Sequence, residues 1–312
     1  MTMNLSTPGI HHVTAVASDP QRTHDFYADT LGLRLVKRSV NQDDTDVYHL
    51  FYADHEGRPG TSMTLFPYPE AGSGRVGTGQ VAAVSFLVPS GSLEYWRERL
   101  EEAGTEPGEV VDRFGDDVLP FSDPDGLPLE LVARPDAPEP NLPESPVAHA
   151  HAIRGFFGVT LSLTGTEPTT DLLTGMGYRQ ADRSADGTRL RYETDGDLGY
   201  VVDVRAEPQA PRGLPGAGTV HHVAYRIDRE AQEGWREFLI DRGLRPTEVI
   251  DRKWFESIYV REYENVLFEF ATAEPGYTVD EDLEALGESL VLPEWLEDRR
   301  ERIEASLPAL ST

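Results

Sequence analysis

Four segments of the chain open with a run of mainly apolar residues that predicts a β-strand. These strands begin at His11 (HHVTAVA), Ala82 (AAVSFLV), Phe157 (FGVTLSL) and His221 (HHVAYRI). An amphipathic helix pattern follows the first, second and fourth strands, and a shorter, weaker one follows the third. Three further strand patterns come after each helix. The chain is therefore predicted to contain four copies of a β-α-β-β-β module.

The helix of the first module has clear start signals. Asp19 is suited to cap its N-terminus, and Pro20 to occupy its first position. Phe26 and Tyr27 follow at a spacing that turns them toward the core. We therefore expect this helix to bury its apolar face against a sheet.

A single module cannot bury both its helix and the face of its sheet, so we expect the modules to pair into two cupped mixed sheets, an α+β fold. The Pro-rich, acidic segment 136–150 predicts a linker. This linker divides an N-terminal domain, residues 1–135, from a C-terminal domain, residues 151–275. Each domain is expected to contain two modules.

Residues 276–312 are predicted to form a helical tail. Pro293 is suited to open a helix over PEWLEDRRERIEASLPAL. Trp295 and Ile303 are available to dock this helix on the rest of the chain.

Two histidine pairs, His11–His12 and His221–His222, occupy the same place in the first and fourth modules. Neighbouring residues of a strand point to opposite faces, so only one member of each pair can enter a given cavity. If these two modules share a barrel, its cavity receives His12, His222 and Glu269. Two imidazoles and one carboxylate are the facial set that holds a non-haem Fe(II) and leaves positions open.

The second and third modules lack histidine at the equivalent positions, where they carry Ala83 and Gly158. Their closing strands contain the carboxylates Glu130 and Asp203. We expect this pairing to be metal-free and structural, with Glu130 an evolutionary remnant or a hydrogen-bonded polar residue. His49, in the strand pattern VYHLFYA, is expected to be a core or rim residue instead of a ligand.

Composition narrows the classes of function. Fifty-five Asp and Glu against 28 Lys and Arg give a net charge of −27, which argues against binding to nucleic acid or to an anionic membrane surface. Without cysteine, a thiolate nucleophile or a zinc–thiolate site is excluded. The start of the sequence lacks a secretory signal pattern, and no apolar run is long enough to span a bilayer. We therefore expect a cytoplasmic protein, for which a homo-oligomer remains open.

The charges have an unusual distribution of residue types. Lys37 and Lys253 are the only lysines, and all other basic residues are arginines. Acid excess with few lysines is typical of proteins from organisms that keep molar salt in the cytoplasm, where a short Debye length screens carboxylate repulsion. The alternative is a high-GC genome that favours arginine codons.

The ordered series of motifs resembles the vicinal-oxygen-chelate superfamily of glyoxalases, bleomycin-resistance proteins and extradiol dioxygenases. The motifs are GIHHVTAV, YHLFYAD–EGRPGTSMTLFP, HAIRGFFGVTL, TVHHVAYRI, RKWFESIYVRE–LFEF and GYTVDEDLEALG. Within the superfamily, the chain is most similar to the dioxygenases that open the rings of hydroquinones and chlorohydroquinones. The resemblance implies a small aromatic substrate, O2 as co-substrate, and the iron ligands His12, His222 and Glu269.

The resemblance also implies a set of substrate-pocket residues, which are His11, Thr14, His221, Arg252 and Tyr259. We expect Tyr259 to supply an O–H group and Arg252 a guanidinium to the substrate. The alternative is that Tyr259 packs as a core aromatic and Arg252 pairs with a surface acid. Lys253 and Trp254 stand where relatives can have smaller or different aromatic residues, so the shape of the pocket stays open.

Three functions are compatible with this reasoning. The first is an Fe(II)-dependent ring-cleaving dioxygenase, in which Mn(II) would satisfy the same ligands. The second is a glyoxalase-type isomerase on Zn or Ni, but Thr64 stands where a second carboxylate would be needed. The third is a drug-binding resistance protein without a metal, which the intact ligand set disfavours.

We predict that the melting temperature rises steadily as KCl increases from about 0.1 to about 3 M, because screening at high salt reduces repulsion among the carboxylates. Thermal unfolding followed by circular dichroism would measure it. A flat or falling curve would instead favour the codon-usage explanation.

Overall fold

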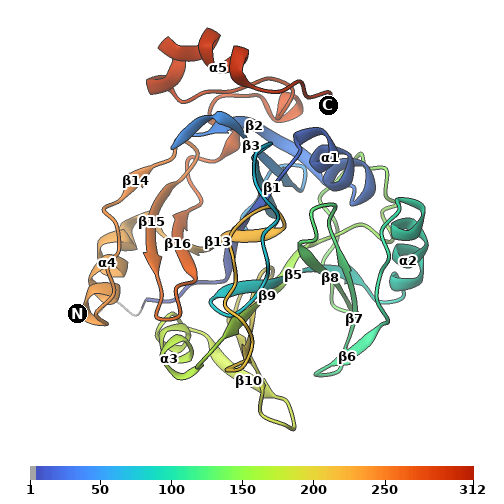
Figure 1. The fold of residues 1–312 in the computed structure, drawn as a ribbon, viewed down its shortest axis with the longest axis vertical. Coiled ribbons are helices and arrows are strands. Elements are labelled where there is room, and N and C mark those ends of the chain that lie inside the picture. The colour runs from blue at the N-terminus through green and yellow to red at the C-terminus, as the bar shows by residue number, and fades with distance from the viewer. Residues whose placement is uncertain (1–4) are drawn as a thin grey trace.

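The computed structural model describes residues 5–312 and contains two curled, eight-stranded mixed sheets (Figure 1). The first sheet has the strand order β14-β15-β16-β13-β1-β4-β3-β2 and combines the first and fourth modules. The second has the order β10-β11-β12-β9-β5-β8-β7-β6 and combines the second and third modules. The predicted α+β fold of paired modules is confirmed.

Each module contributes four strands to its sheet. The strands of the first sheet are β1 (Ile10–Ala17), β2 (Arg34–Asn41), β3 (Asp44–Ala53), β4 (Ser62–Pro67), β13 (Thr219–Ile227), β14 (Ile250–Asp251), β15 (Glu256–Arg261) and β16 (Leu267–Thr272). Those of the second sheet are β5 (Gln80–Pro89), β6 (Val111–Arg113), β7 (Asp116–Ser122), β8 (Pro128–Arg134), β9 (Gly155–Leu163), β10 (Arg179–Arg183), β11 (Arg189–Glu193) and β12 (Val201–Ala206).

A helix follows the first strand of every module, as the sequence predicts. In the first module, the Asp19 side chain accepts a hydrogen bond from the Arg22 N–H at 2.8 Å, and Phe26 and Tyr27 are buried. The second half of this helix winds as a π-helix, which the sequence pattern does not indicate. The module helices are α1 (Pro20–His24) with η1 (Asp25–Thr30), α2 (Leu93–Glu102), α3 (Glu167–Gly175), and η2 (Arg229–Ala231) with α4 (Gln232–Asp241).

The two sheets share one internal plan. In the first, β1 and β13 pair antiparallel at the centre, and each has a parallel neighbour, β4 or β16. In the second, β5 and β9 form the central pair, with β8 and β12 beside them. Each sheet takes one module from either side of the segment 136–150, which contains no helix or strand. The division of the chain into domains at these boundaries stays a prediction.

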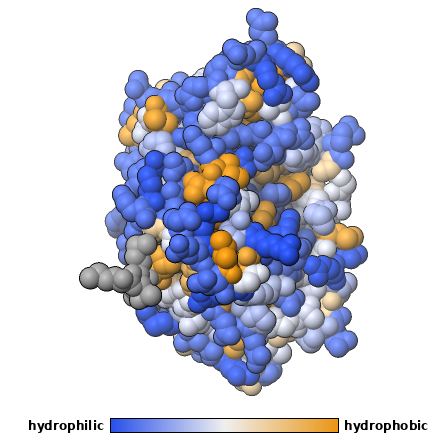
Figure 2. Space-filling model, turned by 90° about the vertical axis from the view of Figure 1, so that its left-hand side faces the viewer, coloured by the Kyte–Doolittle hydropathy of each residue, from blue (hydrophilic) through white to orange (hydrophobic). Residues whose placement is uncertain are grey.

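One continuous apolar core joins both sheets. It includes Val13 of β1 and Val84 of β5, together with Trp96 of α2 and Trp235 of α4, all of them fully buried. The face seen in Figure 2, on the side of β14 and α4, is mostly hydrophilic with small apolar patches. Across residues 5–312, no helix combines the length and the apolar character that a membrane span requires.

The C-terminal residues pack beside β2 and β3, at the top of Figure 1. Ile303 is buried against Val40 of β2, as predicted, but the prediction for Trp295 is wrong because 49% of its surface is exposed. Residues 294–299 wind as a 3-10 helix, which turns Leu296 toward β2 instead of Trp295. The elements of this segment are η3 (Tyr277–Val279), η4 (Leu283–Ala285), η5 (Glu294–Arg299) and α5 (Arg300–Ser306).

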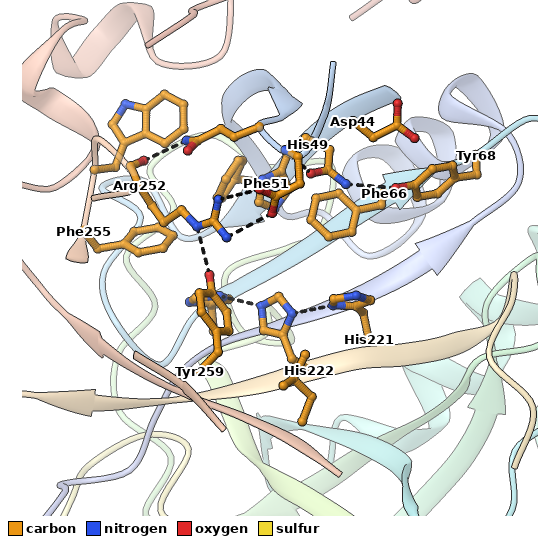
Figure 3. A pocket seen from close by; sticks show the side chains of 16 residues that line it. Asp44, His49, Phe51, Phe66, Tyr68, His221, His222, Arg252, Phe255 and Tyr259 are labelled. Carbon is orange, nitrogen blue, oxygen red and sulfur yellow. Dashed lines mark hydrogen bonds and ion pairs between the residues drawn. The ribbon is translucent and has the colours of Figure 1, made fainter. Parts of the chain in front are cut away.

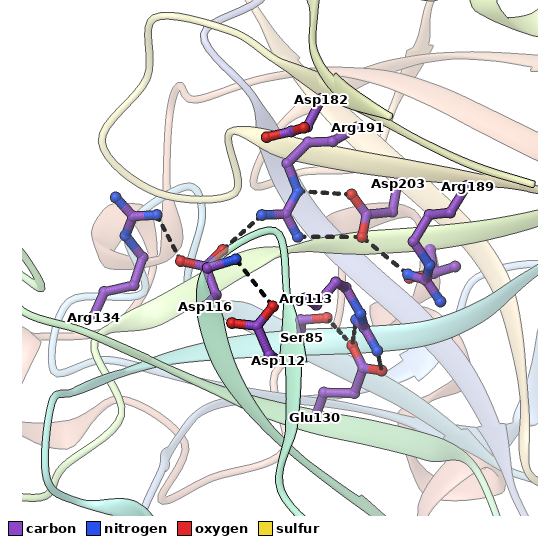
Figure 4. Close-up of polar contacts among 12 residues, drawn as sticks. Ser85, Asp112, Arg113, Asp116, Glu130, Arg134, Asp182, Arg189, Arg191 and Asp203 are labelled. Atoms are coloured by element: carbon purple, nitrogen blue, oxygen red, sulfur yellow. Dashed lines mark hydrogen bonds and ion pairs between the residues drawn. The ribbon is translucent and has the colours of Figure 1, made fainter. Parts of the chain in front are cut away.

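Buried ion pairs connect the strands of the second sheet (Figure 4). Arg113 donates to both carboxylate oxygens of Glu130 at 2.7 Å, and the Ser85 hydroxyl donates to the same carboxylate at 2.6 Å. Arg191, which is 3% exposed, pairs with Asp203 at 2.9 Å. Glu130 is therefore a hydrogen-bonded polar residue, one of the two roles that the sequence left open. The metal-free character of this sheet stays a prediction.

We predict that Arg113→Ala destabilises the fold by about 3 kcal/mol at pH 7, because the buried Glu130 carboxylate loses its cation. Burial would raise the pKa of Glu130, but hydrogen bonds from Arg113 outweigh it and lower that pKa. Such a carboxyl stabilises the fold above its unfolded pKa of about 4.3, and this contribution disappears as the pH falls through the folded value. The cost of the substitution should therefore shrink below about pH 4.

Urea unfolding of the wild type and the variant, at pH 7 and at a pH below about 4, would measure how the cost of the substitution changes. Arg179→Ala is the matched control, because Arg179 and Asp195 form an exposed pair on the same sheet, so the stability should not change. A cost for Arg113→Ala that is independent of pH, or no larger than that of the control, would contradict the prediction.

Candidate metal centre

Three potential metal ligands meet on neighbouring strands of the first sheet. His12 lies on β1, His222 on β13 and Glu269 on β16. The Nε2 atoms of His12 and His222 lie 3.3 and 2.9 Å from Oε2 of Glu269 and 3.2 Å from each other. All three side chains are buried. The structure thus brings together the three residues that the repeat and the resemblance selected.

The hydrogen bonds of Glu269 leave one of its oxygens free. Oε1 accepts a hydrogen bond from the Ser257 hydroxyl at 2.5 Å, whereas the buried Oε2 makes no hydrogen bond although two imidazole nitrogens face it. Burial would raise the pKa of Glu269, but the imidazoles of His12 and His222 hold it well below its usual range. Burial also lowers the pKa of His222, which favours its neutral form. An ionised carboxylate facing a neutral imidazole is a donor set suited to a divalent cation.

Each ligand histidine is held through its other nitrogen by the histidine that precedes it. The Nδ1 atoms of His11 and His12 lie 2.9 Å apart, and those of His221 and His222 lie 2.8 Å apart. A proton on the ligand's Nδ1 leaves its Nε2 lone pair directed at Glu269. The residues therefore fit a metal held through two Nε2 atoms and one carboxylate oxygen.

The first histidine of each pair turns back toward the second, which strict strand alternation does not predict. The register between β1 and β13 shifts between Ile10 and His12, and such an irregularity re-aims side chains. His11 is buried behind His12, and burial followed by the charge of His12 lowers its pKa to about 3. His221 is exposed and lines the cavity described below.

A chain of hydroxyl groups runs from the ligands to the cavity wall. Thr14 Oγ1 lies 2.8 Å from Nε2 of His222 and 2.7 Å from Oγ1 of Thr64, which in turn lies 2.9 Å from Nε2 of His49. Both threonines are fully buried. His49 lines the cavity with Phe51, two residues along the same strand. This position agrees with the core or rim role that the sequence predicts for His49, and the hydrogen bond to Thr64 is a detail that the sequence pattern did not indicate.

A cavity of about 400 Å³ opens beside the two ligand histidines (Figure 3). Aromatic side chains form much of its wall, and polar side chains of the β2–β3 turn lie at its rim. A largely aromatic cavity next to a donor set for a cation suits a small planar ligand. The aromatic and histidine residues that line it are His12, His49, Phe51, Phe66, Tyr68, His221, His222, Trp254, Phe255 and Tyr259.

Arg252 and Tyr259 both line this cavity. Nε of Arg252 donates to the Tyr259 hydroxyl at 3.2 Å, and its Nη2 pairs with Oδ2 of Asp43 at 3.0 Å. Asp43 is 76% exposed, so Arg252 also forms the pair with a surface acid that the sequence analysis gave as an alternative. Burial and the charge of Glu269 raise the pKa of Tyr259, which keeps its hydroxyl protonated. Asp43 gave no signal in the sequence because it lies 209 residues from Arg252.

Comparisons with known proteins agree with this geometry. Residues 9–131 match the family model described as "Glyoxalase/Bleomycin resistance protein/Dioxygenase superfamily". A Bacillus subtilis (strain 168) protein named as the ring-cleaving dioxygenase MhqO is 42% identical over 307 residues, which cover 98% of this chain and 97% of that protein. The chlorohydroquinone/hydroquinone 1,2-dioxygenase of Sphingobium indicum is 34% identical over 305 residues, which cover 95% and 94% of the two chains.

Solved structures give the same result for the fold. A crystal structure of a Bacillus subtilis protein named as a dioxygenase has a TM-score of 0.92 and 42% identity and covers 98% of both chains. Glyoxalase I from Zea mays, with a TM-score of 0.62 and 16% identity over 85% of this chain and 92% of that one, shares the fold alone. The chain therefore belongs to the glyoxalase/bleomycin resistance protein/dioxygenase superfamily.

Proposed function

We propose that this protein is an Fe(II)-dependent dioxygenase that inserts both atoms of O2 into an aromatic diol of the hydroquinone class and opens its ring. The observation that carries the proposal is the pair of ligand histidines facing the free oxygen of Glu269 beside an aromatic cavity. The relatives named as ring-cleaving dioxygenases support the reaction, and the Sphingobium indicum enzyme supports the substrate class. Mn(II) would suit the same three ligands.

His12, His222 and Glu269 would hold the metal on one face. When bound there, the metal supplies coordination positions for the diol and O2 and a path for electron density between them. The aromatic walls of the cavity would hold the ring in a fixed plane and exclude water from it. His221, which lies between the ligand His222 and the ring of Phe66, would form one side of this substrate site.

Arg252 and Tyr259 are the groups best placed to act on the substrate. The Arg252 guanidinium keeps its charge and could exchange the exposed Asp43 for an ionised substrate oxygen. The Tyr259 hydroxyl carries a proton at neutral pH because its pKa is raised, so Oη can donate a hydrogen bond or a proton to developing negative charge. The Thr64 and His49 side chains hold Thr14 next to His222.

The glyoxalase-type alternative has less support at the same site. A second carboxylate ligand is missing from the position of Thr64, whose hydroxyl is already engaged with Thr14 and His49. A resistance protein that binds a drug without a metal would have no use for the free Oε2 of Glu269.

We predict one Fe(II) or Mn(II) per chain, lost in each of His12→Ala, His222→Ala and Glu269→Ala because each removes one of the three proposed ligands. Metal content after anaerobic purification would measure it. Glu130→Gln, at the equivalent carboxylate of the second sheet, is the control and should keep the metal. Full occupancy in His12→Ala would rule out this ligand set.

We predict O2 uptake with hydroquinone at a higher rate than with catechol, and no isomerisation of a hemithioacetal. Tyr259→Phe and Arg252→Ala should retain the metal and lose about tenfold or more in ring cleavage, as expected when a positioned proton donor or charge is removed. An oxygen electrode and the absorbance of the ring-opened product would follow the reaction.

Each outcome of that experiment separates the candidates. A preference for catechol would move the enzyme to the extradiol branch, and hemithioacetal turnover without O2 uptake would identify an isomerase. Wild-type rates in both metal-replete variants would remove Tyr259 and Arg252 from the mechanism.

A further inference from the structure

The two lysines of the chain both contact residues 276–312, here called the C-terminal segment. Lys37 of β2 is fully buried, and its Nζ donates to the Tyr277 carbonyl at 3.0 Å, to Oδ1 of Asp280 at 2.7 Å and to Glu281. These contacts use all three of its N–H groups. Lys253 directs its Nζ to Oδ2 of Asp280 at 3.4 Å and to Glu294. Asp280 is thus shared by a residue of the first module and a residue of the fourth.

Asp280 also holds Trp254. The indole Nε1–H donates to Oδ2 of Asp280 at 2.9 Å, while the Trp254 carbonyl accepts a hydrogen bond from the Gly276 N–H at 2.9 Å. The indole ring is 1% exposed and packs against Phe51, with ring centroids 5.7 Å apart. The Nζ of Lys37 lies 5.5 Å from the indole centroid. The C-terminal segment therefore fixes Trp254 at its backbone and at its side chain.

The stretch of chain around Trp254 also faces the proposed substrate. Residues 252–255, here called the pocket segment, contribute Arg252, Trp254 and Phe255 to the cavity wall. The Phe255 ring lies 5.1 Å from the ring of the ligand His12. A shift of the pocket segment would change the width of the cavity next to the metal centre.

The sheet itself gives the pocket segment little support. The pocket segment connects β14 to β15, and β14 is an edge strand of only two residues. Within it, Lys253 has φ of +74°, a left-handed conformation that non-glycine residues rarely adopt and that the surroundings must maintain. The contacts of Asp280 with Lys253 and Trp254 fall on this strained turn.

We propose that Asp280 is a positioning residue that sets the width of the cavity through Trp254, and so decides which ring substituents the enzyme accepts. This inference rests on the proposed ring-cleaving function and goes beyond it. Asp280 lies outside the cavity lining, so its effect must pass through the pocket segment. The carboxylate meets two ammonium groups and an indole N–H at once, which a neutral side chain cannot reproduce.

The first test compares hydroquinone with chloro- and tert-butylhydroquinone. Asp280→Ala should change the ratio of KM between substituted and unsubstituted substrates about fivefold or more, with the metal content unchanged. Asp280→Asn, which keeps an acceptor for the indole, should have a smaller effect. Glu297→Gln, which removes the charge of an acid paired with Arg300 inside the C-terminal segment, is the matched control and should have none.

A double-mutant cycle decides whether the effect passes through the indole. In a Trp254→Phe background, Asp280→Ala should add little to the change in the KM ratio. Equal effects of Asp280→Ala with and without the indole would overturn the proposal. A uniform loss of kcat for every substrate would also overturn it, since that is the result of general destabilisation.

The second test needs no turnover. In a Trp295→Phe background the remaining tryptophans, Trp96, Trp235 and Trp254, are all buried. Asp280→Ala should increase the quenching of their fluorescence by acrylamide, and Glu297→Gln should not. Unchanged quenching would overturn the proposal even if the enzyme cleaves hydroquinones. If the wild-type protein cleaves no diol, the proposed function fails, and the quenching result still decides whether Asp280 holds Trp254.

Discussion

The antiparallel pairing of β1 with β13 is the contact on which the metal centre depends. It places His12 and His222, 210 residues apart in the chain, within 3.2 Å of each other, and the parallel neighbour β16 adds Glu269. The long connection between the two strands is occupied by the entire second sheet, whose apolar core is continuous with that of the first. The geometry of the three ligands is therefore a property of the whole fold, and neither module could form it alone.

The two sheets show how the same plan meets one electrostatic requirement in different ways. A buried carboxylate on a closing strand needs a positive partner. At Glu130 the partner is the Arg113 guanidinium, which uses both oxygens of the carboxylate. At Glu269 two imidazole nitrogens face an oxygen that has no hydrogen bond, an arrangement that a metal ion would complete. The presence of Ala83 and Gly158 in place of histidine thus accompanies a salt-bridged core where the first sheet has a candidate metal centre.

Internal repetition explains how much of this could be predicted from the sequence. The repeated strand starts and the recurring histidine pair identified the modules and the three residues that meet at the candidate metal centre, because equivalent positions of a repeat occupy equivalent places in a fold. The side-chain directions of His11 and His221 depended on a register shift, which no residue pattern marks. Asp43 and His49 reach the cavity through long-range contacts, and Trp295 was wrongly expected to dock because the 3-10 winding of its segment left no trace in the apolar pattern.

The cavity leaves part of its own wall with little backbone support, because strand pairing at this edge of the sheet would close the space beside the candidate metal centre. The β14 edge is two residues long, and the turn after it contains a left-handed Lys253. The C-terminal segment compensates with charge instead of apolar area: Asp280, Glu281 and Glu294 surround the two lysines of a chain that otherwise uses arginine. An ammonium group offers three N–H donors at a single point, which suits the three separate acceptors around Lys37. The rare lysines are thus found where three separate parts of the chain converge behind the cavity wall.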